Sequence, residues 1–162
     1  MYLYTTYKEE IIIKPLKIGD LVAKVPVIQG GMGIGISRSS LAAAVAKAGG
    51  VGVISGVNVG YDEEDFEKNT LNANLRALKK HIIKAKENSN GGIIGLNLMV
   101  AMNYYEEHVK DAISAGVDLI ISGAGLPTKL PSLVKGSNVK IAPIVSTVRS
   151  THTIFSMLSN EP

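Results

Sequence analysis

Residues 25–54 read VPVIQGGMGIGISRSSLAAAVAKAGGVGVI, and this stretch decides the fold. Its first five residues are a short apolar run that ends at a glycine pair, which is typical of a buried strand. Ser39 or Ser40 can then cap an alanine-rich helix over residues 41–48, which ends at a second glycine pair. Residues 51–54 are again apolar. The stretch therefore predicts a strand, a glycine-rich loop, a helix and a second strand.

The same alternation continues to the end of the sequence. It predicts further strands over residues 93–97, 117–121 and 140–145, and helices over about 70–87, 104–115, 130–135 and 148–158. Strands that are apolar throughout and separated by helices indicate a parallel sheet covered by helices, hence an α/β protein. A complete barrel takes about 250 residues and eight strand–helix units. Because the 162 residues supply five units, we expect either an open doubly wound sheet or a barrel that this chain leaves incomplete.

The segment before the first strand contains two more apolar pieces, residues 11–13 and 18–22. They are predicted to be extended or short helical segments that plug the floor of a barrel. Neither a linker nor a low-complexity tract interrupts the chain, so residues 1–162 are expected to form part of one domain.

Composition excludes several classes of protein. The chain is 46% hydrophobic and 19% charged, as expected for one globular domain with a real core. A net charge of only +3, spread along the chain, argues against nucleic acid as a partner. Without cysteine there is no disulfide or thiolate metal site, and a cytoplasmic location is expected. No run approaches the roughly 18 apolar residues of a membrane helix, so we expect no membrane partner and a soluble protein.

The glycine-rich loop at residues 29–37 is the densest candidate for a binding site. It follows the first predicted strand, and parallel α/β folds bind ligands at that end of the strands. Glycines let the backbone approach a flat ring or a phosphate closely. The dinucleotide fingerprint fails because Ile36 or Arg38 stands where glycine is required, and a Walker loop fails because Ile36 stands where lysine is required. We therefore favour a binding loop of another kind over a tight turn without a ligand.

Polar residues also mark the other predicted strand ends. Asn97 closes the third strand, and its amide should bond either to a ligand or to neighbouring backbone, because an unpaired buried amide is costly. Residues 55–56, 122–127 and 146–147 are rich in Gly or Ser at the ends of the remaining strands. All five strand ends would line one mouth of a barrel.

The titratable residues give weaker signals. His81 and His108 are predicted to be solvated on helix surfaces, and His152 is predicted to be structural. Their spacing matches no metal-ligand pair, so no metal site is predicted. Residues 62–65, Asp-Glu-Glu-Asp, are predicted to be a solvated loop and helix start rather than a catalytic pair of carboxylates.

Several segments together resemble the nitronate monooxygenase family, formerly called 2-nitropropane dioxygenases, which is similar to the flavin-dependent enoyl-ACP reductases. The segments are KIGD at 17–20, PVIQGGMG at 26–33, AGGVGVIS at 48–55, GLNLMV at 95–100 and SGAGLP at 122–127. The resemblance runs in order from about Leu16 to Arg149. It implies an FMN-binding TIM (β/α)8-barrel, incomplete here with about five βα units, and a flavin across the C-terminal mouth.

The resemblance also implies which residues contact the cofactor. Gly30, Gly31 and Met32 would lie against the flavin through their backbone, and Asn97 would contact it. The turn of Gly123, Ala124 and Gly125 would line the pocket. Gln29, directly before the glycines, and Ser146, after the fifth predicted strand, complete the predicted cofactor contacts.

The family reaction oxidises an alkyl nitronate with O2 to a carbonyl compound and nitrite. Alternatives are an enoyl-ACP reductase-like oxidoreductase that uses NAD(P)H, and a non-catalytic fragment. The family's catalytic histidine lies in an Ala-Gly-Gly-His segment after the sixth strand, and these residues contain no such segment. The chain is thus expected to stop before the active site is complete and to be inactive alone.

Overall fold

The structure is a computed structural model that describes residues 13–159 of the chain. It begins with an antiparallel hairpin of β1 (Leu16–Ile18) and β2 (Leu21–Ala23). The prediction of extended segments is confirmed for residues 18 and 21–22, whereas residues 11 and 12 of the other apolar piece lie outside the described residues.

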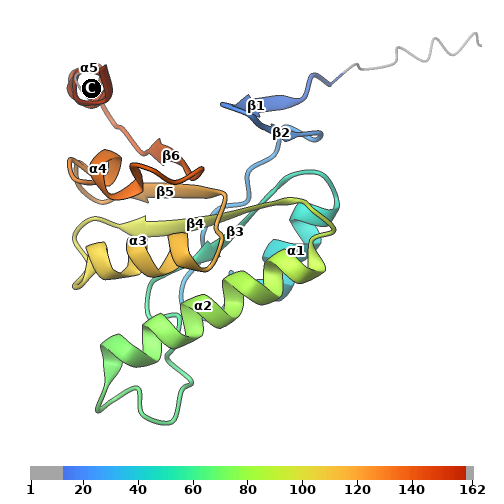
Figure 1. Cartoon of the computed structure of the whole chain (residues 1–162), viewed down its shortest axis with the longest axis vertical. Helices are drawn as coiled ribbons and strands as arrows, with labels where there is room; N and C mark the ends of the chain where they lie inside the picture. Colours follow the sequence, from blue (N-terminus) through green and yellow to red (C-terminus); the bar gives the residue numbers. More distant parts are fainter. Residues whose placement is uncertain (1–12, 160–162) are drawn as a thin grey trace, which may run out of the picture.

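A four-stranded parallel sheet follows, and its strands lie side by side in the order in which they occur in the chain. They are β3 (Val51–Ser55), β4 (Ile93–Met99), β5 (Leu119–Gly123) and β6 (Lys140–Pro143). Five helices of the described chain precede, separate and follow these strands, namely α1 (Ser39–Lys47), α2 (Thr70–Asn88), α3 (Tyr105–Ser114), α4 (Leu130–Val134) and α5 (Val148–Ser159). The predicted alternation of strand and helix is therefore confirmed (Figure 1).

Helices α1–α4 cover one face of the sheet. A single apolar cluster joins the alanine face of α1, the buried faces of α2 and α3, and Leu130 of α4 to the outer residues Ile94, Leu96 and Leu98 of β4. Figure 1 shows α1, α2 and α3 together on the same side of the strands. A doubly wound fold would place helices on both faces, whereas sequential parallel strands with helices on one face are the arrangement of a (β/α)8 barrel.

The opposite face of the sheet corresponds to the inside of the barrel. Val51 and Val53 of β3 and Leu119 of β5 form a second buried cluster there, together with Ala23 of the hairpin. Leu16, Ile18 and Leu21 pack against this cluster. The hairpin thus covers the inner face near the beginning of the strands, which is the position predicted for a floor plug.

The first predicted strand, residues 25–29, is reduced to a single parallel bridge between Ile28 and Val51. The pairing consists of Gln29 N–H to Val51 O at 3.0 Å and Val51 N–H to Val27 O at 2.9 Å. Pro26 has no N–H to donate, and no second strand pairs with this segment within residues 13–159. Residues 25–29 therefore have too few backbone hydrogen-bond partners to form a regular strand.

Element boundaries differ from the prediction in two places that matter for the site. β4 continues to Met99 because Leu98 and Met99 pair with Ser122 and Gly123 of β5, so Asn97 lies inside its strand rather than at the end. Helix α1 begins at Ser39 after Arg38, and no side chain caps it. The prediction of a serine cap is therefore wrong for this helix.

Among the described residues, no helix has both the length and the hydrophobicity required to cross a bilayer.

Candidate functional site

The glycine-rich loop is attached to the sheet by the side chain of Gln29. Its Nε2 donates to Val53 O and to Ser37 Oγ, both at 3.0 Å, and its Oε1 accepts from Val53 N–H at 3.3 Å. The amide therefore pairs with β3 as a strand backbone would. Gln29 stands beside the predicted cofactor face, but its amide is already bound to protein groups.

Gly31 packs directly against Asn97 of β4. A Cβ atom added to Gly31 would lie 2.5 Å from Asn97 Cβ and 3.0 Å from Asn97 Nδ2, closer than real Cβ atoms come. Gly30, by contrast, has no atom within 4 Å of its added Cβ. The structure thus brings together two predicted site regions, the glycine loop and β4, with open space beside Gly30. Met32 continues the loop with a 45% exposed side chain.

Asn97 faces the inside of the barrel. Parallel pairing aligns it with Ser55 on one side and Ile121 on the other, and Ile121 belongs to the residues that pack against the inner cluster. Its backbone oxygen accepts from Gly56 N–H at 3.0 Å, but within residues 13–159 its side-chain amide has no hydrogen-bond partner. An amide has two donors and an acceptor, so this side chain is free to bond a ligand.

The turn after β5 approaches the same region. Gly123 O accepts from Val100 N–H at 2.8 Å, which holds the turn against the end of β4. Ala124 adopts a left-handed backbone conformation with φ 55°, and it is exposed together with Gly125. Such conformations in residues other than glycine cost energy and cluster at functional sites.

Ser146 lies at the corresponding end of β6, exposed, just before α5. The helix is capped by the next residue: Ser150 N–H donates to Thr147 Oγ1 at 3.1 Å, and Thr147 N–H donates to Ser150 Oγ at 3.2 Å. No hydrogen bond in the described part of the chain joins Ser146 to the other predicted site residues. The contacts among predicted site residues join the glycine loop to Asn97, whereas the turn of residues 123–125 contacts Val100 and Ile144, and Ser146 stands apart.

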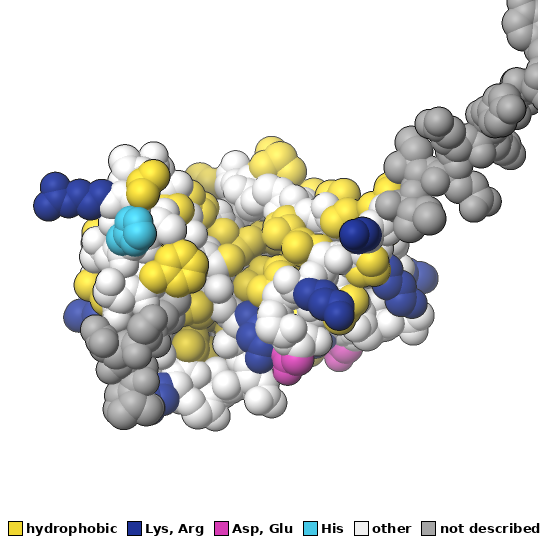
Figure 2. All heavy atoms as spheres, turned by 90° about the horizontal axis from the view of Figure 1, so that it is seen from above, with side chains coloured by type: hydrophobic (Ala, Val, Ile, Leu, Met, Phe, Trp, Pro, Cys, Tyr) yellow, Lys and Arg dark blue, Asp and Glu magenta, His cyan; other side chains and the backbone are white. Residues whose placement is uncertain are grey.

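A pocket of about 500 Å³ adjoins the site between the loops that follow β4 and β5. It is lined by Val100, Tyr104, Tyr105, Glu106, Glu107, Leu126, Pro127, Thr128 and Lys129. An ion pair of 2.6 Å joins Lys129 to Glu106 across these loops. The glycine loop and Asn97 do not line this pocket. Figure 2 shows apolar side chains gathered across the middle of the face opposite α1–α3.

The histidines differ from the prediction. His81 is half-buried rather than solvated, and its Nδ1 lies 3.0 Å from Ser39 Oγ. Burial lowers the pKa of His81, and the nearby positive charge of Arg38 acts in the same direction.

His108 is 2% exposed, and its Nδ1 lies 2.7 Å from Tyr104 O. It belongs to the buried face of α3 with Tyr105, Val109 and Ala112, because residues three and four apart share one face of a helix. The charged neighbours of His108 in the sequence concealed that face. His152 is exposed, and its side chain makes no hydrogen bond or ion pair with the described residues, so its structural role stays a prediction.

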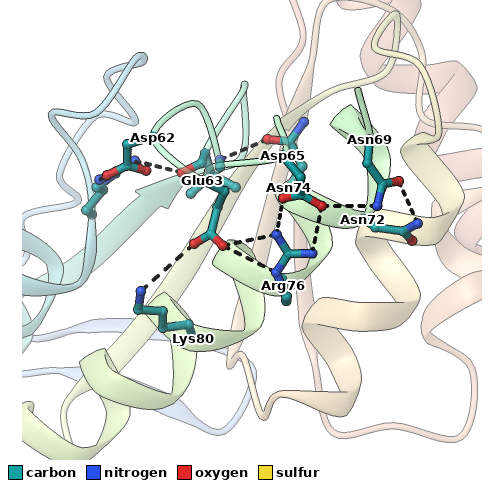
Figure 3. A network of polar contacts seen from close by, with 11 residues as sticks. Asp62, Glu63, Asp65, Asn69, Asn72, Asn74, Arg76 and Lys80 are labelled. Atoms are coloured by element: carbon teal, nitrogen blue, oxygen red, sulfur yellow. Dashed lines mark hydrogen bonds and ion pairs between the residues drawn. The ribbon is translucent and has the colours of Figure 1, made fainter. Parts of the chain in front are cut away.

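The acidic segment 62–65 is a loop in which Asp62, Glu63 and Asp65 are paired with arginines (Figure 3). Arg38 binds both carboxylate oxygens of Asp62, and this interaction lowers the pKa of Asp62 to about 2. Glu63 and Asp65 both bind Arg76 of α2. These ion pairs with arginine agree with the prediction of a loop without a catalytic pair of carboxylates. The predicted helix start is wrong, because α2 begins at Thr70. No group of three or more potential metal ligands occurs among residues 13–159.

The sequence reasoning missed one important residue, Ser37. It is 1% exposed, and its hydroxyl meets groups from Gln29, Gly30 and Met32. A serine after a glycine run was visible in the sequence, but nothing in the sequence showed that the loop folds back onto it.

A family model for nitronate monooxygenase matches residues 14–157. Among solved structures, FabK from Thermotoga maritima is 26% identical, with a TM-score of 0.64 over 82% of this chain and 37% of that chain. A point mutant of the same FabK gives 26% identity and a TM-score of 0.65, over 82% of this chain and 40% of that one. Nitroalkane oxidase from Streptomyces ansochromogenes is 16% identical, with a TM-score of 0.58 over 82% of this chain and 43% of that one. A comparison with curated proteins gives no match.

The chain spans about two fifths of the length of these solved structures. Its sequential parallel strands and one-sided helices, taken with these similarities, make the fold an incomplete (β/α)8 barrel. The match of the family model extends over almost all of the described residues. The chain therefore belongs to the nitronate monooxygenase family.

Proposed function

We propose that this chain forms the flavin-contacting part of an FMN-dependent oxidoreductase of the nitronate monooxygenase type. The reaction proposed for the full-length protein is the oxidation of alkyl nitronates with O2 to a carbonyl compound and nitrite. The observation that carries the proposal is the unpaired amide of Asn97, which packs against Gly31 and lies next to the open space beside Gly30. Family membership supports a flavin oxidoreductase in general.

The residues at this face fit a flat ring with polar edges. The space beside Gly30 is empty for at least 4 Å from an added Cβ, so a ring can lie close to the backbone there. The N–H groups of Gly30 and Gly31 have no acceptor within residues 13–159 and are available to ring oxygens or nitrogens. Bound FMN would supply the redox chemistry, accepting electrons from the substrate and passing them to O2.

Individual residues would then hold and orient the ring. Asn97 would bond its polar edge, because the amide offers both donors and an acceptor. Gln29 would act indirectly by fixing the loop to Val53. The exposed turn of Ala124 and Gly125 would line the pocket from β5, and Ser146 would do so from β6.

A second candidate is an enoyl-ACP reductase-like oxidoreductase that takes electrons from NAD(P)H. The observation that favours it is the greater identity to the two FabK structures, 26%, than to the nitroalkane oxidase, 16%. Both candidates use the same flavin face and differ in the electron donor. A third candidate, a flavin-binding piece without activity, applies to residues 1–162 in isolation.

The test uses the full-length protein, purified and analysed for bound flavin by fluorescence after denaturation. Nitrite release and O2 consumption with an alkyl nitronate would support the monooxygenase. Oxidation of NAD(P)H without nitrite release would support the reductase instead. Failure to bind FMN, even when it is titrated to millimolar concentration, would overturn both.

A further inference from the structure

Ser37 has the most fully bonded side chain of the glycine loop. Its Oγ lies 3.0 Å from Gln29 Nε2, 2.9 Å from Met32 N and 3.3 Å from Gly30 O. A hydroxyl has one donor and two acceptor positions. Ser37 therefore donates to the Gly30 carbonyl and accepts from Gln29 and Met32, which uses all three positions at a site that is 1% exposed.

The backbone of Ser37 is held as firmly as its side chain. Ser37 N–H donates to Met32 O at 2.9 Å, and Ser37 O accepts from Ser55 N–H, also at 2.9 Å. Ser55 is the last residue of β3 and is aligned with Asn97. Ser37 thus joins the glycine loop to β3, the strand that pairs with β4.

These bonds determine which backbone groups of the loop remain for a ligand. The Met32 N–H and the Gly30 C=O are bound to the Ser37 hydroxyl, so they are not available. The N–H groups of Gly30 and Gly31 have no partner within the described residues. The loop has no helical or sheet ladder of its own, and among the described residues this hydroxyl is the side-chain group that bonds the backbone of Gly30 and Met32.

We propose that Ser37 is a positioning residue for the flavin, which sets the Gly30–Met32 backbone so that the two glycine N–H groups face the ring. The inference rests on the proposed function, because the ligand that it orients is the flavin. Ser37 itself is buried beneath the loop and acts through the residues that it binds. No other side chain bonds to both Gly30 and Met32 in the described part of the chain.

The test compares Ser37→Ala with Ser40→Ala in the full-length protein, measuring FMN affinity by fluorescence quenching. Ser40 is a matched control because it is exposed and lies three residues away in α1. We expect Ser37→Ala to weaken FMN binding about tenfold, since several hydrogen bonds that order the loop are lost. The visible absorption bands of the bound flavin should also shift, which a purely structural role would not produce. Ser40→Ala should match the unchanged protein in both measurements.

A second measurement covers the case in which Ser37→Ala does not fold. Amide hydrogen exchange of the unchanged apoprotein should show Met32 N–H protected and the N–H groups of Gly30 and Gly31 exchanging fast. Adding FMN should then protect the two glycines. Equal FMN affinity and spectra in Ser37→Ala, or glycine amides that stay unprotected with FMN bound, would overturn the positioning role alone. If neither the unchanged protein nor Ser40→Ala binds FMN, the proposed function itself fails.

Discussion

Asn97 of β4 lies so close to Gly31 that a Cβ atom on Gly31 would be 2.5 Å from the Cβ atom of Asn97. This contact joins the loop after the first predicted strand to the third predicted strand, although the two residues are 66 positions apart in the sequence. Any side chain at position 31 would push the loop away from β4. The geometry of the proposed flavin face depends on this approach.

Gly31→Ala should therefore destabilise the full-length protein by about 1–3 kcal/mol, the usual cost of overpacking a close contact. Gly30→Ala is the matched control, because its added Cβ meets no atom within 4 Å. Urea unfolding of both apoproteins gives the comparison. Because the clash is with the Cβ of Asn97, combining Gly31→Ala with Asn97→Gly should recover part of the loss. Equal stability of the two alanine variants would show that Gly31 does not pack as described.

Asn97→Ala should weaken FMN binding by about 1–3 kcal/mol, because a buried ring would lose an amide partner. The apoprotein should keep its melting temperature, since the amide bonds to no described protein group. Asn138→Ala, an exposed residue before β6, serves as the control. FMN titration and thermal unfolding separate the two effects. Unchanged FMN affinity would remove Asn97 from the proposed site.

Asp118, just before β5, is expected to be important for stability. Its Oδ2 accepts from Ile94 N–H at 2.8 Å, and Lys86 Nζ binds its two oxygens at 2.7 and 2.8 Å. Asp118→Ala should cost about 1–3 kcal/mol, because charge-assisted bonds to a partly buried group are lost. Glu106→Ala breaks the more exposed pair with Lys129 and should cost less stability than Asp118→Ala, because solvent screens an exposed ion pair. If denaturant unfolding shows a larger loss of stability for Glu106→Ala than for Asp118→Ala, the stabilising role of Asp118 is contradicted.

His81 should make stability depend on pH. Burial lowers its pKa below the ordinary value of 6.5, so between the two values the unfolded chain binds more protons than the folded one. Its contribution to stability is therefore complete above about pH 6.5 and decreases as the pH falls through that value toward the folded pKa. His81→Gln should flatten this part of the curve of unfolding free energy against pH, whereas His152→Gln, at an exposed position, should not. An unchanged slope in His81→Gln would contradict the prediction.

Residues 1–162 expressed alone should self-associate or remain partly folded, with FMN bound weakly. β6 pairs only with β5, and residues 25–29 form a single bridge, so two edges of the described sheet keep unpaired backbone groups. Val27 is 53% exposed and Ile144 is 55% exposed beside these edges. Light scattering after size-exclusion chromatography measures the association, which Val27→Lys should reduce. A monomer that unfolds sharply and binds FMN stoichiometrically would show that the isolated chain is an intact small domain.

The sequence by itself determined the alternation of strands and helices and the α/β class. Apolar runs such as residues 51–54 and 93–97 are long enough for strands, and the glycine pairs and polar segments that bound them are local signals. It also predicted where a candidate site would lie, because polar residues and glycines at the strand ends of a parallel sheet meet at one edge. These properties depend on a residue and its immediate neighbours.

Only the tertiary structure decided what each side chain contacts. Residues 25–29 have the composition of a strand, but a strand needs partners, and one bridge to Val51 is all that the described chain provides. His108 looked solvated because its neighbours in sequence are charged, yet the packing of α3 buries it. Ser37 and Asn97 are both polar residues at predicted strand ends or loops, but the loop saturates the hydroxyl of Ser37, whereas the amide of Asn97 has no partner among the described residues. Hydrogen bonding and burial depend on segments distant in the chain, and local sequence does not specify which of them will meet.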